Sequence, residues 1–224
     1  MILKKLLFIV SVGSSVLSVF AAESTDPGTR LPNYKTELRR VYPDASKIEE
    51  YSFVPAQWGG ISLMGLIGRL VGERAATPFE TINTRRYLYR AYKDENVLGV
   101  THGSSTLSGT GPIDLFVYYN PDSSVRDVRI DRAPTNVVEQ LSEGGYLKQF
   151  INRPAQDFTV TIGRRGRVTD WGDFSRQARR PKDKALAQYF DRIVRSMRFN
   201  AAFVEVAYFI GQHPQTAEQS AQLQ

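Results

Sequence analysis

The sequence contains no cysteine and only two histidines, His102 and His213. Without cysteine there can be no disulfide framework, thiolate metal site, thiol nucleophile or lipid-modified N-terminal cysteine. Two histidines leave little room for a histidine-rich metal site or for a haem with two axial histidines. The chain is therefore expected to work without thiol or histidine-rich metal chemistry.

Recognisable catalytic motifs are also missing. The sequence has no Gly-x-Ser-x-Gly elbow, no paired-histidine zinc motif and no phosphate-loop lysine motif. His102 precedes Gly103 at the end of an expected strand, where a lone histidine is more often structural than a proton donor. Asp114 is expected on the outward face of a strand, with no partner carboxylate at a suitable spacing for acid–base catalysis. We therefore identify no hydrolase or transferase constellation.

Long apolar runs are absent after the first 21 residues. Within residues 1–21, Lys4 and Lys5 precede an apolar stretch that ends with Val19-Phe20-Ala21. This pattern is typical of a secretory signal peptide, and we expect cleavage after about Ala21. An uncleaved anchor is the alternative, but the run is shorter than the roughly 20 apolar residues that a membrane helix needs. The mature protein is expected to be periplasmic or secreted, and not a lipoprotein.

Basic residues outnumber acidic residues only slightly. The chain has 29 basic and 23 acidic residues, and 27 basic residues remain when Lys4 and Lys5 are set aside. No nucleic-acid recognition motif accompanies this mild basicity, so we expect no nucleic-acid partner. The length of 224 residues suits one domain. We expect a leader over 22–40, a single domain over 41–210 and a flexible tail over 211–224.

A β-meander entered through a glycine-containing loop dominates the middle of the chain. Residues 113–119 alternate so that one face would hold Ile113 and every second residue after it, and residues 125–130 repeat the pattern. Residues 120–123, Asn-Pro-Asp-Ser, are typical of a turn. Residues 86–92 and 97–101 predict a preceding hairpin.

Helical spacing of apolar residues occurs in several other segments. It predicts helices over 34–42, 61–72, 137–141 and 182–199, while alternation over 158–162 predicts a strand. Asn200 is a candidate break after the long helix, and residues 201–210 are compatible with either a strand or more helix. The expected class is α+β, with an antiparallel sheet and helices packed on it.

The order of short motifs over residues 41–162 resembles that of the periplasmic FMN-binding domain family. That family has an initial "fP-x-A" segment, a tyrosine-containing hairpin, a Gly-x-x-Gly-Pro-Ile loop, a Pro-Asp-Gly turn and a helix with a Gln-Phe pair. The corresponding segments here are Val41-Tyr42-Pro43-Asp44-Ala45, Tyr89-Arg90-Ala91-Tyr92-Lys93-Asp94, Gly109-Thr110-Gly111-Pro112-Ile113, Asn120-Pro121-Asp122-Ser123 and Tyr146-Leu147-Lys148-Gln149-Phe150. Each motif is short, and their common order carries the resemblance.

The resemblance implies an FMN-binding-domain-like fold and a role in electron transfer, with an exported or membrane redox partner. The redox chemistry would be that of the flavin. The loop would line the flavin ring or its phosphate with Gly109, Thr110, Gly111, Pro112 and Ile113. Arg164 and Arg165 are candidate bidentate phosphate ligands, although a basic turn of this kind is more often a solvated hairpin tip.

The sequence departs from the family in two places. Many members carry a Ser-Gly-Ala-Thr box whose threonine takes FMN through a phosphoester bond. Here residues 167–175 offer only Thr169 and Ser175, without the Gly-Ala context. The family's Glu-Thr-Pro-Gly segment is replaced by Arg-Ala-Pro-Thr at 132–135. We therefore expect non-covalent FMN or, as the alternative, a degenerate domain without flavin that serves as a binding or assembly module.

Overall fold

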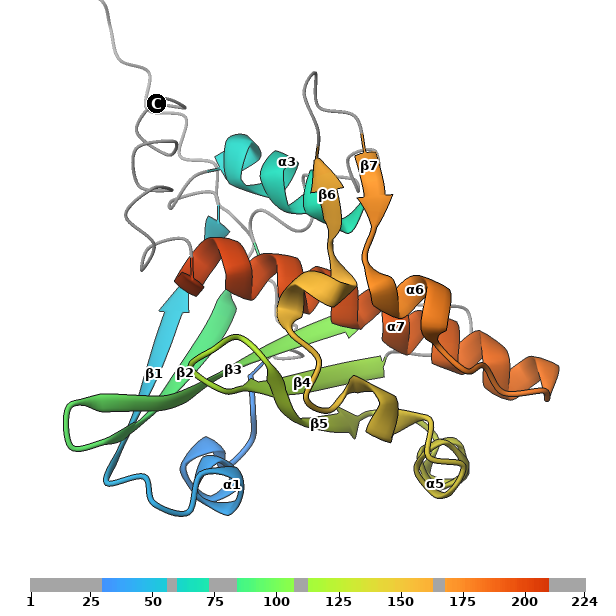
Figure 1. Ribbon diagram of the computed structural model, residues 1–224. Helices are drawn as coiled ribbons and strands as arrows, with labels where there is room; N and C mark the ends of the chain where they lie inside the picture. Colours follow the sequence, from blue (N-terminus) through green and yellow to red (C-terminus); the bar gives the residue numbers. More distant parts are fainter. Residues whose placement is uncertain (1–29, 56–59, 73–83, 107–112, 163–167, 210–224) are drawn as a thin grey trace, which may run out of the picture.

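An antiparallel sheet of five strands forms the centre of the protein, and its strand order follows the chain (Figure 1). The structure is a computed structural model that describes residues 30–55, 60–72, 84–106, 113–162 and 168–209. The strands are β1 (Lys47–Phe53), β2 (Arg86–Lys93), β3 (Asn96–Thr106), β4 (Ile113–Tyr119) and β5 (Val125–Asp131). Each strand pairs with the next one along the chain. The predicted meander and the α+β class are therefore confirmed.

The two tight turns of this meander use residues that tolerate unusual backbone angles. Asp94, between β2 and β3, has a φ of 55°. Between β4 and β5, the Asp122 carboxylate accepts hydrogen bonds from the Ser124 backbone N–H at 3.0 Å and from its hydroxyl at 2.6 Å. Asp and Asn side chains favour turns because they bond to nearby backbone and tolerate left-handed conformations. Both predicted hairpins are present.

The two faces of the sheet are covered by different helices (Figure 1). The long helix α7 (Lys184–Val204) packs on one face, and the short helix α1 (Tyr34–Val41) packs on the other. Strand β4 is buried on both faces. Ile113, Leu115, Val117 and Tyr119 face α7, as the alternation predicts, while Phe116 and Tyr118 join the α1 cluster.

Helix α7 begins at a capping residue and continues past Asn200. Asp183 caps it by accepting a hydrogen bond from the Leu186 backbone N–H at 2.8 Å. Asn200 does not break the helix. Its side chain is fully buried, donates to the His102 carbonyl at 2.8 Å and accepts from the Tyr119 hydroxyl at 3.0 Å. Because the amide is satisfied by the sheet, the helix continues to Val204, and a π-helical turn follows over Glu205–Phe209.

The remaining elements pack around α7. Helix α3 (Gly60–Val71) places Ile67 and Val71 against Phe203. Helix α5 (Thr135–Glu143) and two 3₁₀ turns lead to the small sheet of β6 (Val160–Ile162) and β7 (Val168–Trp171), which is followed by α6 (Asp173–Gln177). Phe158 lies in the second 3₁₀ turn, just before β6, and not in the strand as predicted. Within the described ranges, no helix combines the length and apolar character that crossing a bilayer requires.

The packed core reaches further towards the N-terminus than the expected domain boundary. Leu31 and Leu38 are buried, although both belong to the segment that we assigned to the leader. The backbone N–H of Leu31 donates to the Tyr89 hydroxyl at 2.9 Å. This anchoring depends on a residue 58 positions away, which local composition does not reveal. The expected signal peptide and the 211–224 tail lie outside the described residues.

Candidate functional site

A cleft of about 580 Å³ opens on the α1 face of the sheet, at the beginning of β4 and the end of β5. Three stretches of chain meet there: the segment that leads into α1, the first residues of β4, and the last residues of β5. The lining residues are Arg30, Leu31, Pro32, Asn33, Tyr34, Asp114, Phe116, Asp131 and Arg132. The cleft therefore lies beside the strand that the glycine-containing loop enters.

An ion pair between Asp114 and Arg132 lies at the cleft. The Arg132 guanidinium donates from Nε to Asp114 Oδ2 at 2.5 Å and from Nη2 to Oδ1 at 2.7 Å. The Asp114 side chain is 7% exposed and that of Arg132 is 41% exposed. Asp114 points away from the α7 core as predicted, but it is buried because this face is covered too. Two parallel bonds fix both the position and the plane of the guanidinium.

Arg132 occupies an unusual backbone conformation. Its φ is 53°, and that of Asn33, which also lines the cleft, is 49°. Asparagine visits the left-handed region readily, whereas for arginine the conformation carries a cost of about 1–2 kcal/mol. Such residues persist only where their surroundings hold them, and they gather at functional sites. The strained Arg132 therefore marks the cleft as the strongest candidate site.

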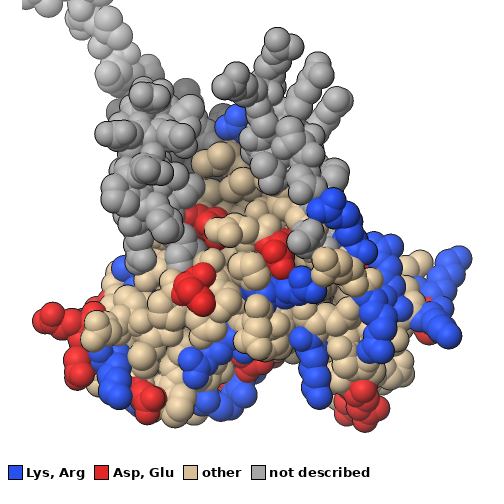
Figure 2. All heavy atoms as spheres, in the orientation of Figure 1, with Lys and Arg blue, Asp and Glu red and all other residues tan. Residues whose placement is uncertain are grey.

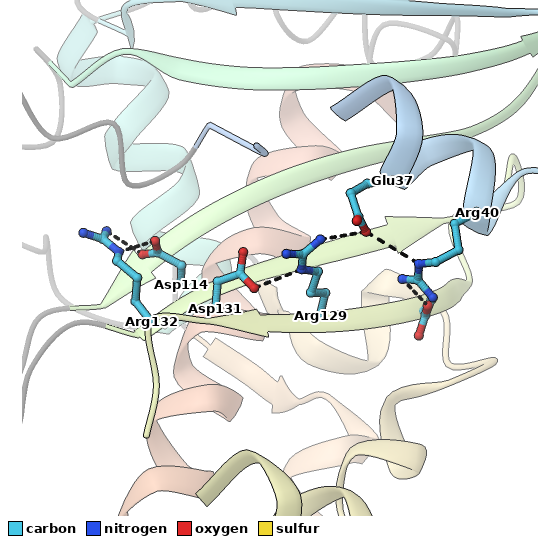
Figure 3. Close-up of polar contacts among 7 residues, drawn as sticks. Glu37, Arg40, Asp114, Arg129, Asp131 and Arg132 are labelled. Atoms are coloured by element: carbon cyan, nitrogen blue, oxygen red, sulfur yellow. Dashed lines mark hydrogen bonds and ion pairs between the residues drawn. The ribbon is translucent and has the colours of Figure 1, made fainter. Parts of the chain in front are cut away.

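A chain of ion pairs extends from the cleft along β5 to α1 (Figure 3). Asp131 accepts from Arg129 at 2.9 Å, and Arg129 also reaches Glu37 of α1 at 2.6 Å. Glu37 lies 3.5 Å from Arg40, which in turn lies 3.6 Å from Asp127. Burial lowers the pKa of Arg129, but its bonds to Asp131 and Glu37 outweigh that effect and raise the pKa above the ordinary arginine value. The network ties α1 to the cleft wall.

The segment before α1 forms the other wall. The Tyr89 hydroxyl accepts from the Leu31 backbone N–H, and the Tyr34 ring lies 5.1 Å from the Tyr89 ring. Burial raises the pKa of Tyr89, which keeps its hydroxyl neutral. Arg30 bonds to the Glu50 carboxylate at 3.0 Å and keeps a side chain that is 53% exposed. Tyr89 is therefore a core residue, and Arg30 adds a second partly exposed cation to the cleft beside Arg132.

The residues that the sequence predicted for the site divide into two groups. Ile113 is 1% exposed and packs in the α7 core, so its side chain does not line the cleft. Its neighbour Asp114 does line it. The other candidates lie outside the described residues: Gly109, Thr110, Gly111, Pro112, Arg164 and Arg165. Thr169 lies in β7 and Ser175 lies in α6.

Sequence reasoning missed Arg30, Tyr34 and Arg132. Tyr34 and Arg132 are almost a hundred residues apart, and only the packing of α1 against the meander brings them together. The one local signal was Pro32-Asn33, because asparagine after proline suits a left-handed turn before a helix. The resemblance noted residues 132–135 only as a departure from the family's Glu-Thr-Pro-Gly segment and assigned no role to Arg132.

His102 lies away from the cleft, between the sheet and α7. It is fully buried and stacks on Phe203, with ring centroids 4.2 Å apart and planes 13° from parallel. Burial, helped by the nearby charge of Arg86, holds the pKa of His102 well below its usual value. Its position agrees with a structural role and not with that of a proton donor at the loop.

Comparisons with family models, with curated proteins and with solved structures gave no match to this chain. Among the described residues, no group of three or more histidine, aspartate or glutamate side chains is arranged to hold a metal ion. A functional proposal can therefore draw only on the geometry of the cleft and on the sequence motifs.

Proposed function

We propose that the protein binds FMN non-covalently in the cleft beside β4, has an FMN-binding-domain-like fold, and serves in electron transfer after export. The observation that carries the proposal is the position of the cleft. It opens at Asp114, two residues after the Gly-Thr-Gly-Pro loop to which the family resemblance assigns the flavin. The loop and the residues that line the cleft are thus adjacent in sequence.

The chemistry of the cleft suits a flavin nucleotide in three respects. Its volume of about 580 Å³ falls within the range of small-molecule sites, which is roughly 300–1,000 Å³. Tyr34 offers an aromatic ring that is only partly buried, and aromatic rings stack with planar partners. Arg30 provides a half-exposed guanidinium beside the opening, and guanidinium groups bind phosphate in a bidentate manner.

The redox chemistry in this proposal belongs to the flavin, which exchanges electrons when it is bound. The residues of the chain bind and orient it. The carboxylates that line the cleft, Asp114 and Asp131, are each held by an arginine. They are therefore built into the cleft wall and are not assigned a role in proton transfer.

The proposal is tested by titrating the purified protein with FMN and, separately, with riboflavin, while following the quenching of flavin fluorescence. Arg30→Glu places a negative charge beside the phosphate, so it should weaken FMN binding about tenfold. Riboflavin has no phosphate, and its binding should change little. Lys35→Glu is the matched control, because Lys35 is exposed on α1 and does not line the cleft.

Two outcomes would contradict the assignment. A protein that binds neither flavin would remove the proposal entirely. Equal weakening of FMN binding by Arg30→Glu and Lys35→Glu would show a general charge effect and would move the site away from this cleft.

A second candidate, a flavin-free binding or assembly module, is favoured by one observation. The two arginines that line the described cleft are already bonded to carboxylates, Arg30 to Glu50 and Arg132 to Asp114. A phosphate would have to compete with these carboxylates. The same titration separates the candidates, because a module that does not bind flavin would leave the fluorescence of FMN unquenched at every FMN concentration.

A further inference from the structure

One short segment carries the whole net charge of the chain. Residues 176–198 contain eight Arg and Lys and two Asp, a net charge of +6, and the complete chain also has a formal net charge of +6. The remaining residues are therefore balanced overall. This segment comprises the end of α6, the connection to α7 and the first two thirds of α7.

The fold turns these cations towards the outside. The apolar side of α7 packs on the sheet through Phe190, Ile193 and Met197, so the polar side of the helix faces away from it. Six of the eight basic residues are exposed, namely Arg176, Arg179, Arg180, Lys182, Lys184 and Arg195. In Figure 2, Lys and Arg side chains gather on the right of the molecule, where Figure 1 places α6 and the first half of α7.

The two aspartates within the segment do little to neutralise it. Asp191 lies 3.4 Å from Arg180, and their side chains are 51% and 64% exposed, so water and salt screen the pair. Asp183 is committed to capping α7. Within residues 176–198, the exposed side chains of Arg179, Arg180, Lys182 and Lys184 therefore concentrate positive charge on one surface, which we call the basic face.

The exposed hydrophobic side chains of the described residues indicate which kind of partner the basic face suits. Protein interfaces and single-stranded nucleic-acid sites depend on aromatic anchors. Among the described residues, the one large hydrophobic side chain that is exposed is Tyr51, at 37%, and it lies in β1. A lipid surface needs no such anchor, because it attracts basic side chains through its diffuse negative potential. We propose that the basic face docks the protein on anionic lipid bilayers.

The test is co-sedimentation with lipid vesicles of the protein as its host produces it. One set of vesicles is neutral phosphatidylcholine, and the other contains about a third of anionic phosphatidylglycerol. An apolar N-terminal segment, where it is retained, binds both kinds of vesicle, so the ratio of the two affinities isolates the charge effect. The protein should prefer the anionic vesicles, and the preference should vanish when the salt concentration is raised several-fold.

Charge reversal assigns the preference to the basic face. Arg180→Glu, Lys182→Glu and Lys184→Glu together should reduce the preference on the order of 100-fold, from about fivefold per basic side chain near an anionic surface. The fold should tolerate the triple variant because all three side chains are exposed. A glutamate at the first position of α7 also interacts favourably with the helix dipole.

The matched control places the same three charges elsewhere. Lys35→Glu, Arg39→Glu and Lys93→Glu replace exposed residues of α1 and the β2–β3 hairpin, and they should leave most of the preference intact. Equal loss in the two triple variants would overturn the proposal, as would the absence of any preference in the unmodified protein. Tighter binding to duplex DNA or to polyglutamate than to anionic vesicles at the same salt would replace the lipid surface by another partner.

Discussion

Arg132 combines a strained backbone with a bidentate ion pair, and the two contributions can be separated by two substitutions. Arg132→Ala removes the guanidinium and keeps a side chain at a φ of 53°. Arg132→Gly removes the same guanidinium but suits that backbone angle. Both variants leave the buried Asp114 carboxylate without its arginine.

The size of each effect follows from burial. Breaking a fully buried ion pair by removing one partner costs 3–5 kcal/mol, but the Arg132 side chain is 41% exposed and water can compensate in part. We expect the free energy of unfolding to fall by about 2 kcal/mol in Arg132→Ala. Arg132→Gly should be about 1 kcal/mol more stable than the alanine variant, because glycine adopts a positive φ without steric cost.

Urea denaturation followed by circular dichroism measures both differences. Combining Arg132→Ala with Asp114→Asn should restore about 1 kcal/mol, since the unpaired buried charge is then gone. An alanine variant at least as stable as the glycine variant would refute the left-handed assignment at Arg132. If Arg132→Ala and Arg132→Gly were both as stable as the unmodified protein, the Asp114 carboxylate would not be buried beside Arg132.

Three further predictions concern the core, and urea denaturation measures all of them. Gly99→Ala should cost about 3 kcal/mol, because the new methyl group would overlap the Tyr42 ring and the Tyr119 carbonyl oxygen; a neutral effect would mean that these groups do not approach Gly99. Asn200→Ala should cost about 3 kcal/mol, because the Tyr119 hydroxyl and the His102 carbonyl lose a buried partner. Stability equal to that of the unmodified protein would contradict this bridge. The pKa of His102 is lowered in the folded state, so the unfolded chain binds the proton more readily. Stability should therefore fall by up to about 1.4 kcal/mol per pH unit below pH 6.5. A His102→Gln variant with the same slope as the unmodified protein would refute the assignment to this residue.

Much of the fold followed from alternation and helical spacing. The period of two in residues 113–119 correctly placed Leu115 and Val117 on one shared face, which packs on α7. The spacing in residues 182–199 correctly identified the buried side of α7. Such patterns are local, and each reports on a single element. Asn200 was misjudged because a polar residue in an apolar helix resembles a break until its partners on the sheet are known.

The cleft was beyond local reasoning for a related physical reason. Its walls come from segments before α1 and after β5, and their meeting depends on the Leu31–Tyr89 hydrogen bond and on the ion-pair network from Glu37 to Asp131. None of these contacts leaves a periodic signal. The glycine-containing loop precedes β4 in the sequence, at the strand end where the cleft opens, but it could not identify the side chains opposite.

The visible absorbance spectrum of the purified protein, taken before and after addition of FMN and removal of excess ligand, tests the central claim most directly. The account predicts that the visible absorption bands of the flavin remain with the protein and are released on denaturation, as expected for a non-covalent complex. A spectrum without flavin bands after FMN has been added would contradict it.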